Sequence, residues 1–149
     1  MDSKTELTLV GTVQVNGTET RMPDKDLVWC ESSFLEGFLE KRTVPIGETT
    51  VRIHTVQKEI KASMAAVFDL GDKAETAICI IWELVQRQPK GEEGALALNT
   101  ANYFFVRDAR GELNKIRVDW YHEYQVWMIV AYLVGEEFPL RAESQIFSL

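Results

Sequence analysis

The chain has few of the residues that mark disulfide-rich and membrane-spanning proteins. Its two cysteines, Cys30 and Cys79, lie far apart without a Cys-x-x-Cys spacing, so neither a disulfide framework nor a redox motif is indicated. We expect both to be small buried residues of a protein in a reducing compartment. The longest apolar run, residues 126–134, is too short to cross a bilayer, and residues 1–6 are polar. The sequence therefore predicts a cytoplasmic protein that does not enter membranes.

Clustered positive charge is also missing. The chain has 16 Lys and Arg against 23 Asp and Glu, a formal net charge of -7, and no three basic residues lie together. Because phosphate backbones are bound by concentrated positive charge, we expect no nucleic-acid partner. The sequence has no nucleophile elbow, phosphate-binding glycine loop or dinucleotide fingerprint, and its histidines show no metal-binding spacing. We therefore expect no resident metal and no cofactor.

The apolar content is that of one ordinary domain. Of the 149 residues, 46% are apolar and 10% aromatic. A chain of this size buries about two-thirds of its unfolded surface when it folds. The sequence contains no internal repeat or low-complexity tract. Residues 1–149 are therefore interpreted as a single domain.

The N-terminal part predicts a hairpin followed by a helix. Residues 7–15 alternate between apolar and polar side chains, and Asn16-Gly17 is typical of a two-residue hairpin turn. Residues 23–26 carry helix-start signals, and Pro45 ends the element that follows. Its apolar residues recur at helical spacing, and basic residues lie near its end: Leu27, Cys30, Phe34, Phe38, Lys41 and Arg42. We predict an amphipathic helix of about four turns there.

The middle of the chain predicts strands. Residues 51–56, 62–70 and 77–85 are rich in apolar side chains, and Gly71-Asp72 marks a turn between the last two segments. Residues 88–94 are polar and contain Gly and Pro, as loops do. We therefore expect three strands before this loop.

A second hairpin dominates the C-terminal half. Residues 101–107 and 113–121 are predicted strands, joined by a turn that places Gly111 in the left-handed region. Residues 123–134 contain no Gly or Pro, which favours a helix capped by Gly135, while their β-branched residues leave a strand as the alternative. The remaining residues predict an extended tail with apolar side chains available for packing: Phe138, Leu140, Ile146 and Phe147. The predicted fold class is α+β with an antiparallel sheet.

The hairpin resembles the last hairpin of the NTF2-like superfamily, which includes SnoaL-like polyketide cyclases and ketosteroid-isomerase relatives. Members typically have an aromatic strand, an Asp-x-x-Gly turn and a second strand ending in two aromatics and an Asp. Residues 104–122 match with Phe104-Phe105, Asp108-Ala109-Arg110-Gly111 and Trp120-Tyr121-His122. The resemblance covers the last third to half of the chain. The family usually begins with two helices, where this chain predicts a hairpin, and His122 stands in place of the final carboxylate.

The resemblance implies a cone-like fold. A curved antiparallel sheet would wrap a long helix from the N-terminal half, leave a cavity for a hydrophobic small-molecule ligand, and be followed by a C-terminal helix and tail. It also implies a homodimer formed through the outer face of the sheet. That face would carry Asp119, Tyr121 and Glu123, which alternate with the inner-face residues along the strand.

Two side chains are candidate catalytic groups. Strand alternation places Ile116, Val118, Trp120 and His122 on one face. A histidine at the mouth of an apolar cavity can exchange protons near neutral pH, since its ordinary pKa is about 6.5; the alternative is a structural histidine at a strand end. Glu83 interrupts an apolar run, so it either lies in the cavity with a raised pKa or faces solvent on an exposed sheet face.

The candidate substrate-binding residues are Trp82, Tyr103, Trp120 and His54. Trp82 can equally fill the core, and His54 can equally be structural. The first functional hypothesis is a cofactor-independent isomerase, cyclase or dehydratase acting on a small hydrophobic carbonyl compound. His122 would abstract a proton, and Glu83 or Tyr103 would stabilise the enolate.

The rival hypothesis is a non-enzymatic acidic binding protein, either an inhibitor or immunity-type module that recognises a basic partner or a ligand carrier. A third is a homodimeric scaffold whose cavity is closed by side chains. An open apolar pocket that contains His122 or Glu83 favours the enzyme. A filled core with acidic and aromatic side chains gathered on an outer surface favours the binding protein.

Overall fold

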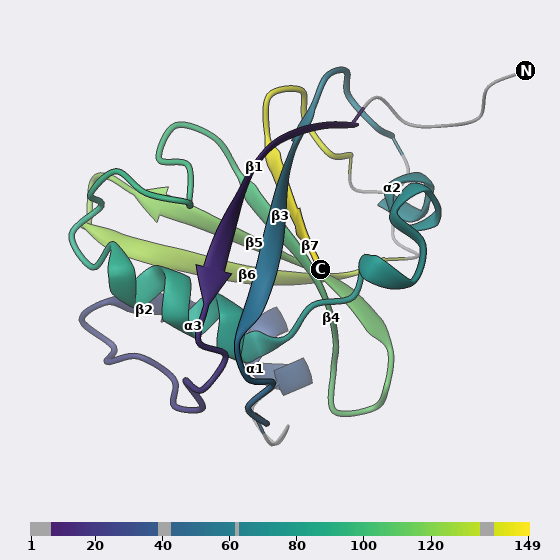
Figure 1. The fold of residues 1–149 in the computed structure, drawn as a ribbon. Helices are drawn as coiled ribbons and strands as arrows, with labels where there is room; N and C mark the ends of the chain where they lie inside the picture. The colour runs from purple at the N-terminus through teal and green to yellow at the C-terminus, as the bar shows by residue number, and fades with distance from the viewer. Residues whose placement is uncertain (1–6, 39–42, 62, 135–138) are drawn as a thin grey trace, which may run out of the picture.

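The computed structural model describes residues 7–38, 43–61, 63–134 and 139–149. Its elements, in chain order, are β1 (Leu7–Val15), β2 (Val28–Cys30), α1 (Ser32–Phe38), β3 (Thr49–Val56), α2 (Ser63–Leu70), the 3-10 turn η1 (Gly71–Lys73), α3 (Ile78–Arg87), β4 (Asn102–Arg107), β5 (Leu113–Tyr121), β6 (Val126–Leu133) and β7 (Gln145–Ser148). The fold is α+β (Figure 1). No helix in these ranges is long and apolar enough to cross a membrane.

Seven strands of the described chain form one mixed sheet in the order β1-β3-β7-β4-β5-β6-β2. The pairs β2/β6 and β4/β7 are parallel, and the remaining neighbours are antiparallel. The sheet twists strongly, so that β1 and β3 run steeply across the direction of β5 and β6 in Figure 1. The prediction of an antiparallel sheet is therefore correct for most pairs and wrong for two.

Helices α1 and α3 pack against one face of the sheet. Ile80, Ile81 and Leu84 of α3 are fully buried in one core with sheet residues of β4, β5, β6 and β7. Phe34 of α1 stacks on Phe38 at 4.9 Å between ring centroids and meets Trp82 edge-on at 5.8 Å. This side of the sheet is filled by side chains.

A second, smaller core lies on the opposite face. It joins Tyr103, Phe105 and Ile146 of the sheet to Ala66 of α2 and to Leu140. This core covers the β4 and β7 part of that face and the end of β3, because its buried sheet residues come from those strands. The β5 and β6 part of the same face carries the groove described below.

Two predicted strands are helices. Residues 78–85 lie in α3, and every one of them is buried. An apolar run buried on all sides has no alternation to distinguish a strand from a core helix. Residues 63–70 form α2, which fits its content of Met, Ala and Leu, all good helix formers. Ala62 lies outside the described residues.

The predicted C-terminal helix is a strand, as the alternative interpretation held. Trp127, Ile129 and Ala131 of β6 are buried, and the residues between them are half-buried. The reversal before β6 uses neither Gly nor Pro, because Gln125 adopts a φ of 54°, and its side-chain amide donates to the His122 carbonyl at 2.8 Å. Gly135, the expected helix cap, lies outside the described residues.

The N-terminal predictions need two further corrections. Strand β1 pairs with β3 rather than with the segment after Asn16-Gly17, because the Gly17 carbonyl accepts from Ile46 and Gly47 at the entrance to β3. The predicted four-turn helix is replaced by β2, which pairs with β6, and by α1. Its expected basic end, Lys41 and Arg42, lies outside the described residues.

The C-terminal tail becomes a central strand. Strand β7 lies between β3 and β4, parallel to β4, and Leu140, Ile146 and Phe147 are fully buried. Phe138 lies outside the described residues. The predicted β4–β5 hairpin and strand β3 are confirmed, and Gly111 has the expected positive φ of 85°.

Candidate functional site

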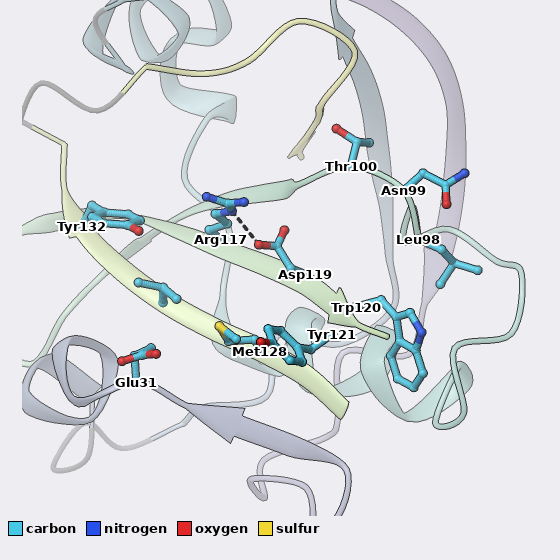
Figure 2. A pocket seen from close by; sticks show the side chains of 11 residues that line it. Glu31, Leu98, Asn99, Thr100, Arg117, Asp119, Trp120, Tyr121, Met128 and Tyr132 are labelled. Atoms are coloured by element: carbon cyan, nitrogen blue, oxygen red, sulfur yellow. Dashed lines mark ion pairs between the residues drawn. The ribbon is translucent and has the colours of Figure 1, made fainter. Parts of the chain in front are cut away.

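The main depression is an open groove of about 610 Å³ over β5 and β6, on the sheet face opposite α3. We call it the β5–β6 groove (Figure 2). Arg117, Asp119 and Tyr121 of β5 line it. Strand pairing sets Val130 of β6 beside Arg117 and Met128 beside Asp119. Antiparallel register thus gathers five side chains on one surface.

The two rims of the groove come from segments far from β5 in sequence. Glu31 follows β2; its backbone N–H donates to Ile129 and its carbonyl accepts the first hydrogen bonds of α1. The opposite rim is the loop 98–100. Buried Asn102 holds the start of this loop through two hydrogen bonds with Ala97, at 2.8 and 2.9 Å. Figure 2 shows Glu31 and this loop on opposite sides of the Arg117–Asp119 pair.

An ion pair lies on the floor of the groove. Arg117 Nε is 2.6 Å from Asp119 Oδ2, and the two side chains are 34% and 24% exposed. Burial raises the pKa of Asp119, although the Arg117 and Arg141 guanidinium groups oppose that shift. The Asp119 carboxylate is therefore partly shielded from water, and this effect outweighs the neighbouring positive charges. Side chains with shifted pKa values are common at sites that bind ligands or move protons.

Aromatic side chains border the ion pair. Trp120 packs edge-on against buried Trp127, with 5.3 Å between ring centroids, and also reaches the groove. Tyr121 stacks on exposed Tyr124 at 5.1 Å. Tyr132 lines the end of the groove nearest Arg117. The groove can therefore hold an apolar or aromatic body beside fixed charges.

Glu83 lies on α3, away from the groove. Its carboxylate accepts from the Asn16 backbone N–H at 2.9 and 3.0 Å and from the Gly17 N–H at 3.0 Å. It also pairs with Arg87, which donates to the Gln14 carbonyl at 2.8 Å. Glu83 is 9% exposed. In this arrangement the carboxylate holds the corner after β1 against α3.

His122 lies in the turn after β5 and is exposed. The predicted alternation of side chains along β5 holds up to Trp120. The strand ends at Tyr121, so His122 does not share the face of Ile116, Val118 and Trp120 that packs against the core. The histidine lines a neighbouring depression of about 480 Å³ with Trp120 and Gln125. Glu83 does not line that depression. The structure therefore does not bring the two predicted catalytic groups together in one cavity.

The predicted substrate-binding residues are dispersed. Trp82 is 2% exposed and belongs to the α3 core. Tyr103 is equally buried, and burial raises the pKa of its hydroxyl. His54 Nε2 lies 2.9 Å from Ser148 Oγ, and burial followed by the charge of Arg52 lowers its pKa. Of these four residues, Trp120 lines the groove.

The groove residues that sequence reasoning missed are Glu31 just after β2, the loop 98–100 and three residues of β6. Asp119 and Tyr121 were assigned to an outer stripe, which is where they lie. Glu31, Met128 and Tyr132 had no role, because residues 27–38 and 123–134 were predicted to be helical. For Met128 and Tyr132, the alternation of side chains along β6 was the available signal. Among the described residues, no three His, Cys, Asp or Glu side chains converge as metal ligands would.

Comparison of the chain with models of protein families, with curated proteins and with solved structures found no match.

Proposed function

We propose that this protein is a non-enzymatic binding protein of the ligand-carrier kind, which holds a small organic molecule in the β5–β6 groove. The observation that carries the proposal is the combination of an open groove of about 610 Å³ with a filled core on the other face of the sheet. Ligand sites typically have about 300–1,000 Å³ and a mainly apolar lining with few polar groups. Here Met128, Val130 and Tyr132 supply the apolar part of the lining, beside the charged side chains Glu31, Arg117 and Asp119.

Binding explains the groove better than proton transfer does. A general acid and base must both reach the reacting atom, whereas Glu83 is bonded to the corner after β1 and His122 lines a different depression. Arg117 and Asp119 are already paired. A fixed pair of opposite charges suits the orientation of a polar ligand.

The proposal is tested by filling the groove. We would titrate 1-anilinonaphthalene-8-sulfonate into the wild-type protein and into Met128→Trp, and follow its fluorescence. The larger indole occupies the centre of the groove, so binding is expected to weaken about tenfold or more, as loss of a good apolar contact does. Thr12→Trp adds the same side chain at an exposed position of β1 and should leave binding unchanged. Equal affinity in all three proteins would refute the groove as the binding site.

The predicted homodimer would cover the same face, since Asp119 and Tyr121 line the groove. Sedimentation velocity of the wild-type protein and Met128→Trp separates the two proposals. A dimer that dissociates in the variant supports an interface. A monomer in both, with weaker probe binding in the variant, supports a ligand groove.

A second candidate is the NTF2-like isomerase or cyclase, with the sheet wrapped as a cone around a helix and a hydrophobic carbonyl compound as substrate. Its supporting observation is that the depression lined by His122 adjoins the groove through Leu98, Asn99 and Trp120. Deuterium exchange next to the carbonyl of a cyclic ketone tests it. His122→Ala should abolish exchange and His54→Ala should not. Exchange that is the same in both variants would remove His122 as the base.

A further inference from the structure

Trp29 is an exposed tryptophan beside the β5–β6 groove. It is 49% exposed, whereas Trp82 and Trp127 are 2% and 0% exposed. It lies in β2, the three-residue strand at one end of the sheet. A single exposed apolar side chain is ordinary in a folded protein, so its exposure alone indicates no function. The face of the sheet on which Trp29 lies is more informative.

Strand pairing places Trp29 on the groove face. In the parallel pair β2/β6, Trp29 lies beside Met128, which lines the groove. The residues on either side of Trp29, Val28 and Cys30, pack in or against the α3 core on the opposite face. Side chains alternate along a strand, so Trp29 points to the groove side. Glu31, two residues further along, lines the groove as this alternation requires.

A row of neighbouring side chains crosses three strands of this face. Asp119 of β5 pairs with Met128 of β6, and Met128 pairs with Trp29 of β2. Neighbouring strands are about 4.8 Å apart, so the row is roughly 10 Å long. It begins at the Arg117–Asp119 ion pair, continues over a thioether and ends at an indole. The sheet therefore holds a polar end and an apolar end at a set separation.

We propose that the ligand is an elongated planar molecule, with a group at one end that both donates and accepts hydrogen bonds, as a carboxamide does, and with fused aromatic rings that reach from Asp119 across Met128 to Trp29. This inference rests on the proposed function, because the molecule occupies the β5–β6 groove.

The side chains of the row fit the two parts of such a molecule. A carboxamide supplies a donor for the Asp119 carboxylate and an acceptor for Arg117. The ion pair is made through Nε of Arg117, and a guanidinium carries five N–H donors in all. A thioether and an indole both make favourable contacts with aromatic rings. A single ring is too short to touch both ends of a row of roughly 10 Å.

NMR titration with two probes tests the inference: benzamide and naphthalene-2-carboxamide, which share the amide and differ by one ring. Trp29→Ala should weaken naphthalene-2-carboxamide about fivefold or more, because a contacting tryptophan is truncated, and should leave benzamide unchanged. Trp29→Phe keeps a ring and should retain most of the affinity. Leu9→Ala is the matched control, since Leu9 is apolar, 54% exposed and lies on β1 at the opposite edge of the sheet. It should change neither affinity.

The indole N–H signal of Trp29 gives an independent readout. Its absence from the spectrum of Trp29→Phe assigns it among the signals of the four tryptophans. The signal should shift with naphthalene-2-carboxamide and not with benzamide. A shift with both probes, or equal weakening of both in Trp29→Ala, would mean that one ring already reaches the indole, and would overturn the proposed length of the ligand.

Failure of the inference is distinguishable from failure of the proposed function. If Met128→Trp weakens both probes and Trp29→Ala weakens neither, the groove binds ligands without extending to β2, and the inference is overturned. If Met128→Trp changes neither affinity, the groove is not the binding site and the proposed function fails. Weakening of both probes in Met128→Trp, with weakening of naphthalene-2-carboxamide alone in Trp29→Ala, supports the inference.

Discussion

Replacing Glu83 by Ala is expected to lower the free energy of unfolding by about 3 kcal/mol. The substitution leaves the Asn16 and Gly17 backbone N–H groups without the carboxylate that accepts from them at 2.9–3.0 Å. An unsatisfied buried donor costs about 1–3 kcal/mol; the Gly17 N–H is such a donor, and the Asn16 N–H, in an exposed residue, adds a part of that cost. Arg87 adds little, because its side chain is 41% exposed and water can replace its partner.

Urea unfolding followed by tryptophan fluorescence measures this loss, since the chain has four tryptophans. In thermal unfolding, about 3 kcal/mol corresponds to a lower midpoint by roughly 6–12 °C for a domain of this size. Glu83→Gln keeps one acceptor oxygen and should lose about half as much free energy.

The matched control is Glu75→Ala. Glu75 also pairs with an arginine, Arg107, at 2.9 Å, but the two side chains are 45% and 49% exposed. Such a pair contributes at most about 0.5–1 kcal/mol. If Glu83→Ala stays within about 0.5 kcal/mol of the wild type, the carboxylate does not hold the corner after β1. Weaker ligand binding with unchanged stability would instead make Glu83 a functional group.

Three further predictions concern titration and close packing. Burial alone would raise the pKa of Asp108, but hydrogen bonds from the Glu112 and Arg110 backbone and the Asn114 side chain hold it below its ordinary value. The Asp108 carboxylate therefore stabilises the fold at neutral pH, and this contribution is lost as pH falls through the folded-state pKa. Asp108→Asn should lower stability at pH 7 and have little effect in strong acid. Urea unfolding at both pH values checks this. The raised pKa of Asp119 has the opposite sign: wild-type stability should fall as pH rises through the window above the ordinary pKa, and unfolding curves of Asp119→Asn should lack that decline. Gly91 has a φ of 71°, and an added Cβ would lie 2.3 Å from Trp120, so Gly91→Ala should lower the free energy of unfolding by about 2–4 kcal/mol and alter tryptophan emission. Gly111→Ala is the control, because Gly111 also has a positive φ but open space around it, and it should cost about 1 kcal/mol. Equal losses of unfolding free energy in the two variants would refute the contact between residue 91 and Trp120.

The sequence alone was sufficient to predict the elements that depend on neighbouring residues only. The β4–β5 hairpin follows from two alternating segments and from Gly111, whose φ of 85° suits glycine. The same alternation placed Asp119 and Tyr121 on one face, and the structure confirms it. These predictions succeeded because the period of a strand and the chemistry of a turn depend on neighbouring residues only.

Tertiary structure decided the rest. Residues 78–85 are buried on all sides, and nothing local tells a helix from a strand in such a run. Gln125 reverses the chain before β6 without Gly or Pro, and β7 enters the middle of the sheet by pairing with β3 and β4. The groove depends on this pairing, because Glu31, Met128 and Tyr132 line the same groove as Asp119 only when β6 pairs with β5 and β2 pairs with β6. Which strands pair, and which face stays uncovered, is set by burial summed over the whole chain, and no short segment contains that information.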